Sequence, residues 1–183
     1  DRRKKASEAM QLLKEAQVAL ARLVRDVNNS IRARVVLLPA NSAGDNIIFH
    51  AEGGDVVLPL LRQQKDGEEC LSLSDFVKPC GTDYVGAFAV TAGRGIEEII
   101  SGYQQTDDFK ALLYQSLSDR LAEAAAELLH ARVRREVWGY APDERIDRQR
   151  ALRAQYRGIR PAAGYPSLPD QSAIFAIEKI VGF

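Results

Sequence analysis

The stretch RVVLLPANSAGDNIIFH, residues 34–50, indicates what kind of sheet this chain builds. Residues 35–38 and residues 47–49 are apolar and rich in β-branched side chains, which favours extended backbone. Residues 39–46 between them contain Pro, Asn, Ser, Gly and Asp, the residues that favour turns. This order predicts two antiparallel strands, 34–38 and 47–50, joined by a turn-rich segment.

A third strand is expected at residues 84–91, YVGAFAVT. Its small, β-branched and aromatic side chains suit a buried, central position in a sheet. Residues 56–61 are also apolar, but Pro59 cannot donate a hydrogen bond to a neighbouring strand, so the state of this segment stays open. Residues 70–73 alternate weakly between polar and apolar and lead into 75–77.

Apolar periodicity and start and stop signals predict helices before and after these strands in the sequence. The first runs from about Ala6 to Val27, stops at Asn28–Asn29, and has one apolar stripe of Ala9, Leu12, Leu13, Ala16, Leu20, Leu23, Val24 and Val27. The longest begins at Asp107–Asp108 and reaches about Trp138. Shorter helices are expected from Ile96 to about Tyr103 after the Gly93-Arg94-Gly95 turn, from Asp147 to Gln155, and from Pro169–Asp170 onward.

The composition is that of a globular protein. The chain has 183 residues, 46% of them hydrophobic and 27% charged, and a formal net charge of zero. These properties suit one compact domain, or one domain with an appendage, and we expect a single domain over residues 1–183. The neutral balance argues against broad binding to nucleic acid, and no apolar run is long enough to span a bilayer.

The few cysteines and histidines also limit the chemistry. Cys70 and Cys80 have no metal-ligand spacing and do not resemble a disulfide framework, so we expect reduced thiols in a cytoplasmic protein. His50 and His130 are the only histidines, and no metal site is expected. There is no nucleophile elbow, phosphate-loop signature or Cys-x-x-Cys, so no catalytic residue is predicted.

The segment Arg157–Pro166, RGIRPAAGYP, is the strongest candidate for a binding loop. Pro161 restricts the backbone of Arg160 to extended conformations, and the prolines remove backbone donors. A stiff loop that presents arginines and a tyrosine ring suits a small ligand with a carboxylate at one end and a ring or cation elsewhere. A simple connector between helices explains the same residues, and chemistry alone leaves both interpretations open.

The longest predicted helix carries a polar stripe. Its apolar face consists of Leu113, Leu117, Leu121, Ala124 and Leu128. Asp119, Glu123 and His130 lie on a nearly opposite stripe, with Glu127 beside them. One interpretation is a solvated face. The other is that Asp119 and Glu123 point into a shared cavity, where Glu123 receives an ammonium group and Asp119 bonds an imidazole.

A basic cluster of Arg132, Arg134 and Arg135 follows, next to Trp138, the only tryptophan. It is too short for a nucleic-acid patch and is offset by neighbouring acidic residues. Two interpretations remain, namely cations that favour the helix dipole and a docking edge for a partner.

Six runs together resemble the C-terminal activation domain of cobalamin-dependent methionine synthases. They are residues 61–64 (LRQQ), 74–77 (SDFV), 83–93 (DYVGAFAVTAG), 119–124 (DRLAEA), 132–144 (RVRREVWGYAPDE) and 156–166 (YRGIRPAAGYP). They occur in the order of the family and cover nearly the whole chain.

The resemblance implies an α+β fold with a twisted antiparallel sheet and surrounding helices. It also implies a reactivation module of a methyltransferase in methionine biosynthesis. In such enzymes S-adenosylmethionine donates the methyl group that restores accidentally oxidised cobalamin, and flavodoxin or a flavoprotein reductase supplies the electron. The implied partners are this electron donor and the neighbouring domain that carries cobalamin.

The resemblance assigns site residues by their place in these motifs. The S-adenosylmethionine-binding positions fall on Arg160, Ala162, Gly164, Tyr165 and Glu123. Arg160 is the expected partner of the ligand carboxylate. Asp119 matches a position that contacts the displaced histidine of the cobalamin domain, and Ala154 stands where the family has a further glutamate. The module is expected to place the sulfonium methyl near cobalt without a catalytic group of its own.

The resemblance leaves a second function open. Family domains begin with an aspartate- and aromatic-rich segment and end with a strand-rich segment that carries another ligand-contacting tyrosine. Neither is found in this sequence, so we expect part of a domain. The alternative is therefore an interaction module that docks on flavodoxin or on the cobalamin domain without retaining the ligand.

Overall fold

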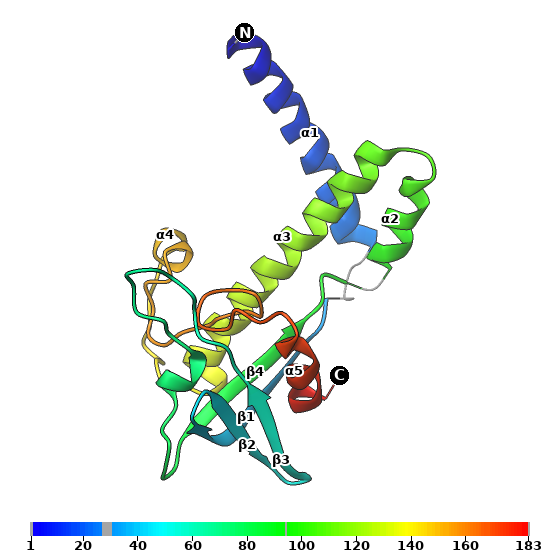
Figure 1. Cartoon of the computed structure of the whole chain (residues 1–183). Coiled ribbons are helices and arrows are strands. Elements are labelled where there is room, and N and C mark those ends of the chain that lie inside the picture. The colour runs from blue at the N-terminus through cyan, green and yellow to red at the C-terminus, as the bar shows by residue number, and fades with distance from the viewer. Residues whose placement is uncertain (1, 27–30, 94, 183) are drawn as a thin grey trace. The chain divides into compact units, whose positions relative to one another are not determined.

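The computed structural model describes residues 2–26, 31–93 and 95–182. It combines helices with a four-stranded sheet, which confirms the predicted α+β class (Figure 1). The chain divides into two compact units. One consists of residues 1–33 and 90–131, and the other of residues 34–89 and 132–183. The expectation of one domain over residues 1–183 stays a prediction.

The second unit is built on the sheet, whose strand order is β3-β2-β1-β4. The strands are β1 (Ala33–Ala43), β2 (Asn46–Ala51), β3 (Gly54–Pro59) and β4 (Tyr84–Val90). β1 and β2 are antiparallel with Ala40 opposite Phe49, which confirms the predicted pair. Gly44 has a φ of 59° in the turn between them, at the position where a two-residue hairpin turn favours glycine.

Two details of the sheet differ from the sequence-based prediction. β1 continues through Pro39 to Ala43, so most of the predicted turn segment is strand. The register of β1 with β2 begins at Ala40, which leaves Pro39 just outside it. β4 lies at an edge of the sheet and has no fully buried residue, so the predicted central position is wrong. The open segment 56–61 contributes the other edge strand, β3, which ends at Pro59, a position that sheets tolerate.

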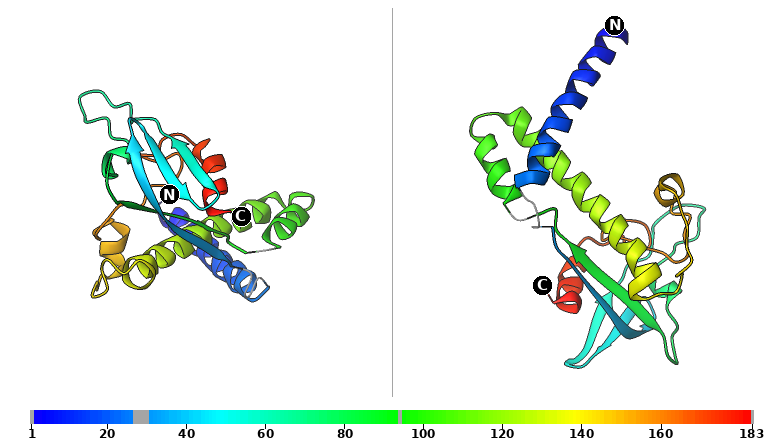
Figure 2. Two further views of the ribbon diagram at one scale, coloured as in Figure 1. Left: turned by 90° about the horizontal axis from the view of Figure 1, so that it is seen from below. Right: turned by 180° about the vertical axis from the view of Figure 1, so that it is seen from behind.

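The core of this unit lies between the sheet and the C-terminal segment. Ile47 and Phe49 in β2 are 0% and 1% exposed, and alternate with less buried neighbours, as a strand with one face on a core should. The helix α5 (Ala173–Val181) packs against β3 (Figure 2). Its Ile180 belongs to the same core. Burying a side chain of this size contributes about 1.5–3 kcal/mol.

The first unit is helical. It contains α1 (Arg2–Asp26), α2 (Ile96–Gln104) and nearly all of α3 (Asp108–Arg132). Its core consists of Ala19, Leu23, Ile96, Ile100 and Tyr114. Tyr114 stacks on Tyr103 with the ring centroids 5.2 Å apart. The positions of α2 and α3 confirm the two predicted helices that begin at Ile96 and at Asp107–Asp108.

The predicted apolar stripe of α1 is buried only in part. Leu23 is fully buried, whereas Leu12, Leu13 and Val24 are 46%, 52% and 52% exposed. Periodicity indicates which residues share a face, but not how much of that face is covered. The predicted helix end at Asn28–Asn29 and Arg94 of the predicted turn lie outside the described residues.

Side chains and a widened turn define the ends of α3. Asp107 begins it, because its Oδ1 accepts a hydrogen bond from the Lys110 N–H at 3.0 Å. After Arg132 the chain forms a π-helical turn over Val133–Val137, so the predicted extent to about Trp138 is confirmed with a change of helix type. The remaining short elements are the 3₁₀ turn Leu73–Phe76 and α4 (Arg148–Leu152). None of the helices in the described part of the chain is long and apolar enough to cross a membrane.

Candidate functional site

The segment Arg157–Pro166 lies between α4 and α5 and is neither helix nor extended strand, as predicted. Its second half closes a compact turn. The Tyr165 N–H donates to the Ala162 carbonyl at 3.0 Å, and the Gly164 N–H donates to the Leu168 carbonyl at 2.9 Å. Leu168 is 3% exposed and belongs to the core under the sheet, so the end of the loop is anchored.

The predicted ligand-binding residues of the loop are accessible to different degrees. Arg160 is half-buried, whereas Ala162, Gly164 and Tyr165 are exposed, Tyr165 by 62%. Gly164 has a φ of 90°, and a Cβ there would lie 2.9 Å from Gln171 Cγ. The turn that presents the tyrosine ring therefore requires glycine at position 164.

The start of the loop is held by Tyr140, which the sequence reasoning did not identify. The Tyr140 hydroxyl donates to the Arg157 carbonyl at 3.3 Å, and Arg157 Nη1 donates to the Tyr140 carbonyl at 3.0 Å. A Cβ on Gly158, whose φ is 90°, would lie 2.8 Å from the Tyr140 hydroxyl oxygen. Burial raises the pKa of Tyr140, so its hydroxyl stays a neutral donor at ordinary pH.

Arg134, in the π-helical turn that precedes Tyr140, forms a buried ion pair with Glu144. Its side chain is 1% exposed and that of Glu144 is 10% exposed. Arg134 Nε and Nη2 donate to Glu144 Oε2 at 2.8 and 2.7 Å. Its guanidinium also lies 4.2 Å from the ring centroid of Tyr156. Arg134 is therefore not part of an exposed docking edge, whereas its place in the last helical turn leaves the interpretation as a cation that favours the helix dipole open.

Trp138 connects this region to the sheet. A Cβ on Gly86 in β4 would lie 3.3 Å from Cζ3 of Trp138 and 3.0 Å from a methyl carbon of Leu37. The indole is therefore packed on the strand, although it remains 39% exposed. The Tyr140 ring meets it edge-on, with the centroids 5.4 Å apart.

Asp119 and Glu123 are exposed side chains of α3, one turn apart, in the helical unit. Asp119 accepts a hydrogen bond from Gln115 Nε2 at 3.1 Å, and Glu123 pairs with Arg120 at 2.8 Å. Both bonds are local contacts on an exposed helix face. The four predicted residues of the loop belong to the other unit, which contains the sheet.

The polar stripe on α3 is only partly as predicted. His130 is 5% exposed, so it is a buried side chain and not a member of an exposed stripe. Conversely Leu128, assigned to the apolar face, is 63% exposed. Leu113, Leu117 and Leu121 do pack on the core of the helical unit. The apolar face therefore holds for the first half of the helix.

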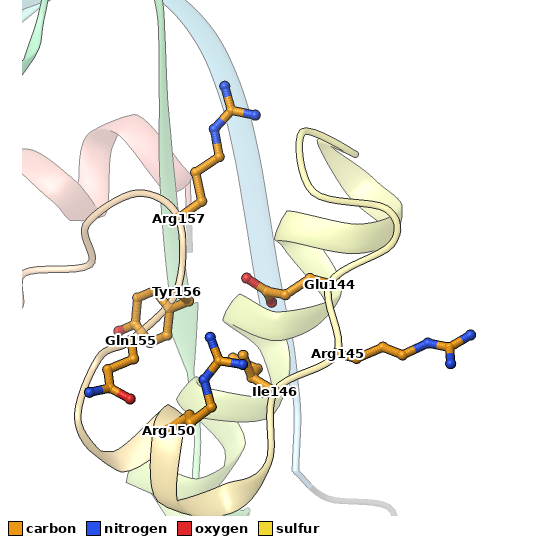
Figure 3. A pocket seen from close by; sticks show the side chains of 7 residues that line it. All are labelled: Glu144, Arg145, Ile146, Arg150, Gln155, Tyr156 and Arg157. Carbon is orange, nitrogen blue, oxygen red and sulfur yellow. The ribbon is translucent and has the colours of Figure 1, made fainter.

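A cavity of about 450 Å³ lies in the same unit as the loop and is lined by Glu144, Arg145, Ile146, Arg150, Gln155, Tyr156 and Arg157 (Figure 3). The guanidinium groups of Arg145 and Arg157 extend away from the space that Glu144, Arg150 and Tyr156 surround. None of the predicted ligand-binding residues is among its seven lining residues. The cavity adjoins the start of the loop and is distinct from the predicted site.

Two further features bear on chemistry. Cys70 and Cys80 are free cysteines, as predicted. Within residues 2–26, 31–93 and 95–182, no group of three or more His, Cys, Asp or Glu side chains is arranged to hold a metal ion. Ala154, which stands where a family glutamate was expected, has a φ of 51° and so occupies a left-handed conformation that non-glycine residues rarely adopt.

The chain is similar to known proteins in both sequence and fold. The whole chain, residues 1–183, matches the family model of the vitamin B12 dependent methionine synthase activation domain. Among solved structures the chain is similar to the MetH reactivation domain bound to AdoHcy, with 38% sequence identity and a TM-score of 0.84. The similarity covers 96% of this chain and 57% of the solved chain. This chain therefore spans little more than half the length of that relative.

Proposed function

The chain belongs to the family of the activation domain of vitamin B12-dependent methionine synthase, and from this premise we propose that it binds S-adenosylmethionine for reactivation of the enzyme. One observation carries the proposal. The chain is similar, over 96% of its length, to a reactivation domain bound to AdoHcy, the compound that remains when S-adenosylmethionine gives up its methyl group.

The residues of the loop suit such a ligand. S-adenosylmethionine has a carboxylate, an ammonium group, a sulfonium and an adenine ring. The half-buried guanidinium of Arg160 can form charge-assisted hydrogen bonds with the carboxylate. The exposed ring of Tyr165 offers a face for the sulfonium or the adenine, beside the backbone of Ala162 and Gly164.

The helical unit supplies the acidic residues of the proposal. Glu123 would bind the ligand ammonium, exchanging its exposed pairing with Arg120 for that contact. Such an exchange costs little, because an exposed ion pair contributes about 0–1 kcal/mol. Asp119 would accept a hydrogen bond from a histidine of the cobalamin-carrying domain.

The proposed role of the chain is positioning. Cobalamin, held by a neighbouring domain, would supply the cobalt that accepts the methyl group, and flavodoxin or a flavoprotein reductase would supply the electron. Holding the sulfonium methyl in line with its acceptor lowers the entropic part of the barrier. Such a role requires no acid, base or nucleophile from this chain, so we do not expect the isolated chain to be catalytic.

Calorimetry with S-adenosylmethionine and with AdoHcy tests the proposal. We expect Arg160→Ala to weaken binding at least tenfold, because a charge-assisted hydrogen bond to a carboxylate is worth about 1.5–3 kcal/mol. Arg148→Ala, which removes an exposed arginine of α4, is the matched control and should bind as the unmodified chain does. Absence of binding, or binding that Arg160→Ala leaves unchanged, would show the proposed site to be wrong.

Docking without a ligand is the second candidate function, favoured by the exposed edge at the end of α3. Val137 and Trp138 are 52% and 39% exposed beside the exposed side chain of Arg132. Flavodoxin or the cobalamin-carrying domain would be the partner. A pull-down of flavodoxin that is insensitive to S-adenosylmethionine and is lost in Val137→Asp would support docking; capture that depends on S-adenosylmethionine would contradict it.

A further inference from the structure

Tyr140 stands between the sheet and the candidate binding loop. Its ring meets Trp138 edge-on, and Trp138 is packed on Gly86 of β4. Its backbone lies in a turn in which the Ala141 N–H donates to the Arg134 carbonyl at 2.9 Å. The hydroxyl therefore projects from a position fixed on one side by the sheet and on the other by the π-helical turn.

The hydroxyl meets the loop at two neighbouring backbone positions. It donates to the Arg157 carbonyl, and it occupies the space that a side chain on Gly158 would need, 2.8 Å from the position of that Cβ. Arg157 returns a hydrogen bond to the Tyr140 carbonyl, and its guanidinium lies 5.8 Å from the ring centroid of Tyr140. Contacts in both directions between the same two residues fix the distance and the orientation of the loop start.

The path from this contact to Arg160 is short. Arg160 is three residues beyond Arg157, a span of at most about 10 Å even when extended. Pro161 narrows the backbone choices of Arg160 from the other side. The segment between Arg157 and Arg160 is short and has few conformations available. A displacement of the Arg157 carbonyl would therefore move Arg160 as well.

We propose that Tyr140 is a positioning residue for the ligand loop, and that its hydroxyl sets the placement of Arg160 against the carboxylate of S-adenosylmethionine. The inference rests on the proposed function and assigns a positioning role to a residue outside the predicted ligand contacts. A group held to the right place by a second layer of contacts binds more tightly than the same group on a free loop.

Tyr140→Phe tests the inference, because it removes the hydroxyl and keeps the ring against Trp138. With AdoHcy as the probe in calorimetry, we expect the dissociation constant to rise about threefold to tenfold, the equivalent of one hydrogen bond. Tyr84→Phe, on an exposed tyrosine of β4, is the matched control and should leave the dissociation constant unchanged. Trp138 is the only tryptophan of the chain, so its fluorescence follows the same titration and confirms that the variants are folded.

A double-mutant cycle with Gly158→Ala separates positioning from a general loss of stability. With Tyr140 present, the new Cβ meets the hydroxyl oxygen at 2.8 Å; with phenylalanine the nearest ring carbon is at 3.5 Å. The backbone strain at a φ of 90° is the same in both backgrounds. We therefore expect Gly158→Ala to weaken AdoHcy binding severalfold more in the chain with Tyr140 than in Tyr140→Phe.

The outcomes distinguish the inference from the function on which it rests. Tyr140→Phe binding as tightly as the unmodified chain, or equal losses from Gly158→Ala in both backgrounds, would overturn the role of Tyr140 alone. Failure of the unmodified chain to bind AdoHcy would overturn the proposed function, and the inference with it.

Discussion

At the scale of single residues, the buried charge of Arg134 is the feature with the largest energetic consequence. Its guanidinium, 1% exposed, donates hydrogen bonds to Glu144 and lies against the Tyr156 ring. Removing both charges from water is costly, and only good hydrogen-bond geometry offsets that cost. Through its contact with Tyr156, Arg134 joins the π-helical turn after α3 to the residue that precedes the ligand loop.

Removing either partner of this pair should be strongly destabilising. We expect Arg134→Ala to lower the free energy of unfolding by about 3–5 kcal/mol, because Glu144 would be left as a buried charge without its partner. Lys65→Ala, from the exposed pair Lys65–Glu68, should cost less than about 1 kcal/mol. Urea denaturation measures both, and the double variant Arg134→Ala/Glu144→Ala should lose less than the two single losses combined. Equal losses for the buried and the exposed pair would contradict this account.

Single residues show which parts of the candidate site could be predicted from the sequence and which could not. Arg160 and Tyr165 could be proposed from the sequence because proline and glycine stiffen the segment that presents them. The burial of Arg134 could not, because its partner Glu144 lies ten positions further along the chain, a spacing that follows no helical or strand period. Tyr140 was also missed, since its role depends on a turn that brings it to Arg157, seventeen residues away.

At the scale of elements, local patterns predicted what each segment forms better than where it lies. The antiparallel pair β1–β2 and the start of α3 follow from β-branched runs and from a capping aspartate. The position of β4 at the sheet edge does not, because small and aromatic residues there cover a half-exposed surface as readily as a buried one. The length of β1 beyond Pro39 depends on its neighbouring strands, which no local pattern contains.

Arg62 links the β1–β2 turn to the 3₁₀ turn Leu73–Phe76 through ion pairs with both. These ion pairs make the stability of the fold depend on pH. Arg62 donates to both carboxylate oxygens of Asp75 at 2.8 Å, and also pairs with Asp45 in the β1–β2 turn at 2.7 Å. The side-chain hydrogen bonds from Arg62, followed by the Ser72 N–H, lower the pKa of Asp75 below its ordinary value of 3.8. Protonation of Asp75 therefore favours the unfolded chain.

This shift predicts stability that is present above about pH 4 and is lost as the pH falls through the lower pKa of the folded state. We expect Asp75→Asn to be less stable than the unmodified chain at pH 6, and the difference to shrink as the pH falls to 2. Asp66→Asn, on an exposed aspartate, is the control and should keep the acid dependence of the unmodified chain. Thermal melts between pH 2 and 7 measure it; a difference that does not change with pH would contradict the assignment.

At the scale of the whole molecule, the described residues form two hydrophobic cores, one in each compact unit. Leu23 is fully buried in the helical core and Ile47 in the core under the sheet. A chain of this length can unfold as a single cooperative domain, as the sequence predicts, or as two units in succession.

We expect a single cooperative transition. Leu23→Ala and Ile47→Ala should each lower the free energy of unfolding by about 2–5 kcal/mol, through lost burial and the cavity left behind. Two probes distinguish the outcomes: far-UV circular dichroism reports mainly the helices, and Trp138 fluorescence reports the unit that contains the sheet. If the chain is one domain, both substitutions shift both probes to the same urea midpoint. If Leu23→Ala moves the dichroism transition and leaves the fluorescence transition in place, the two units unfold separately and the single-domain prediction is wrong.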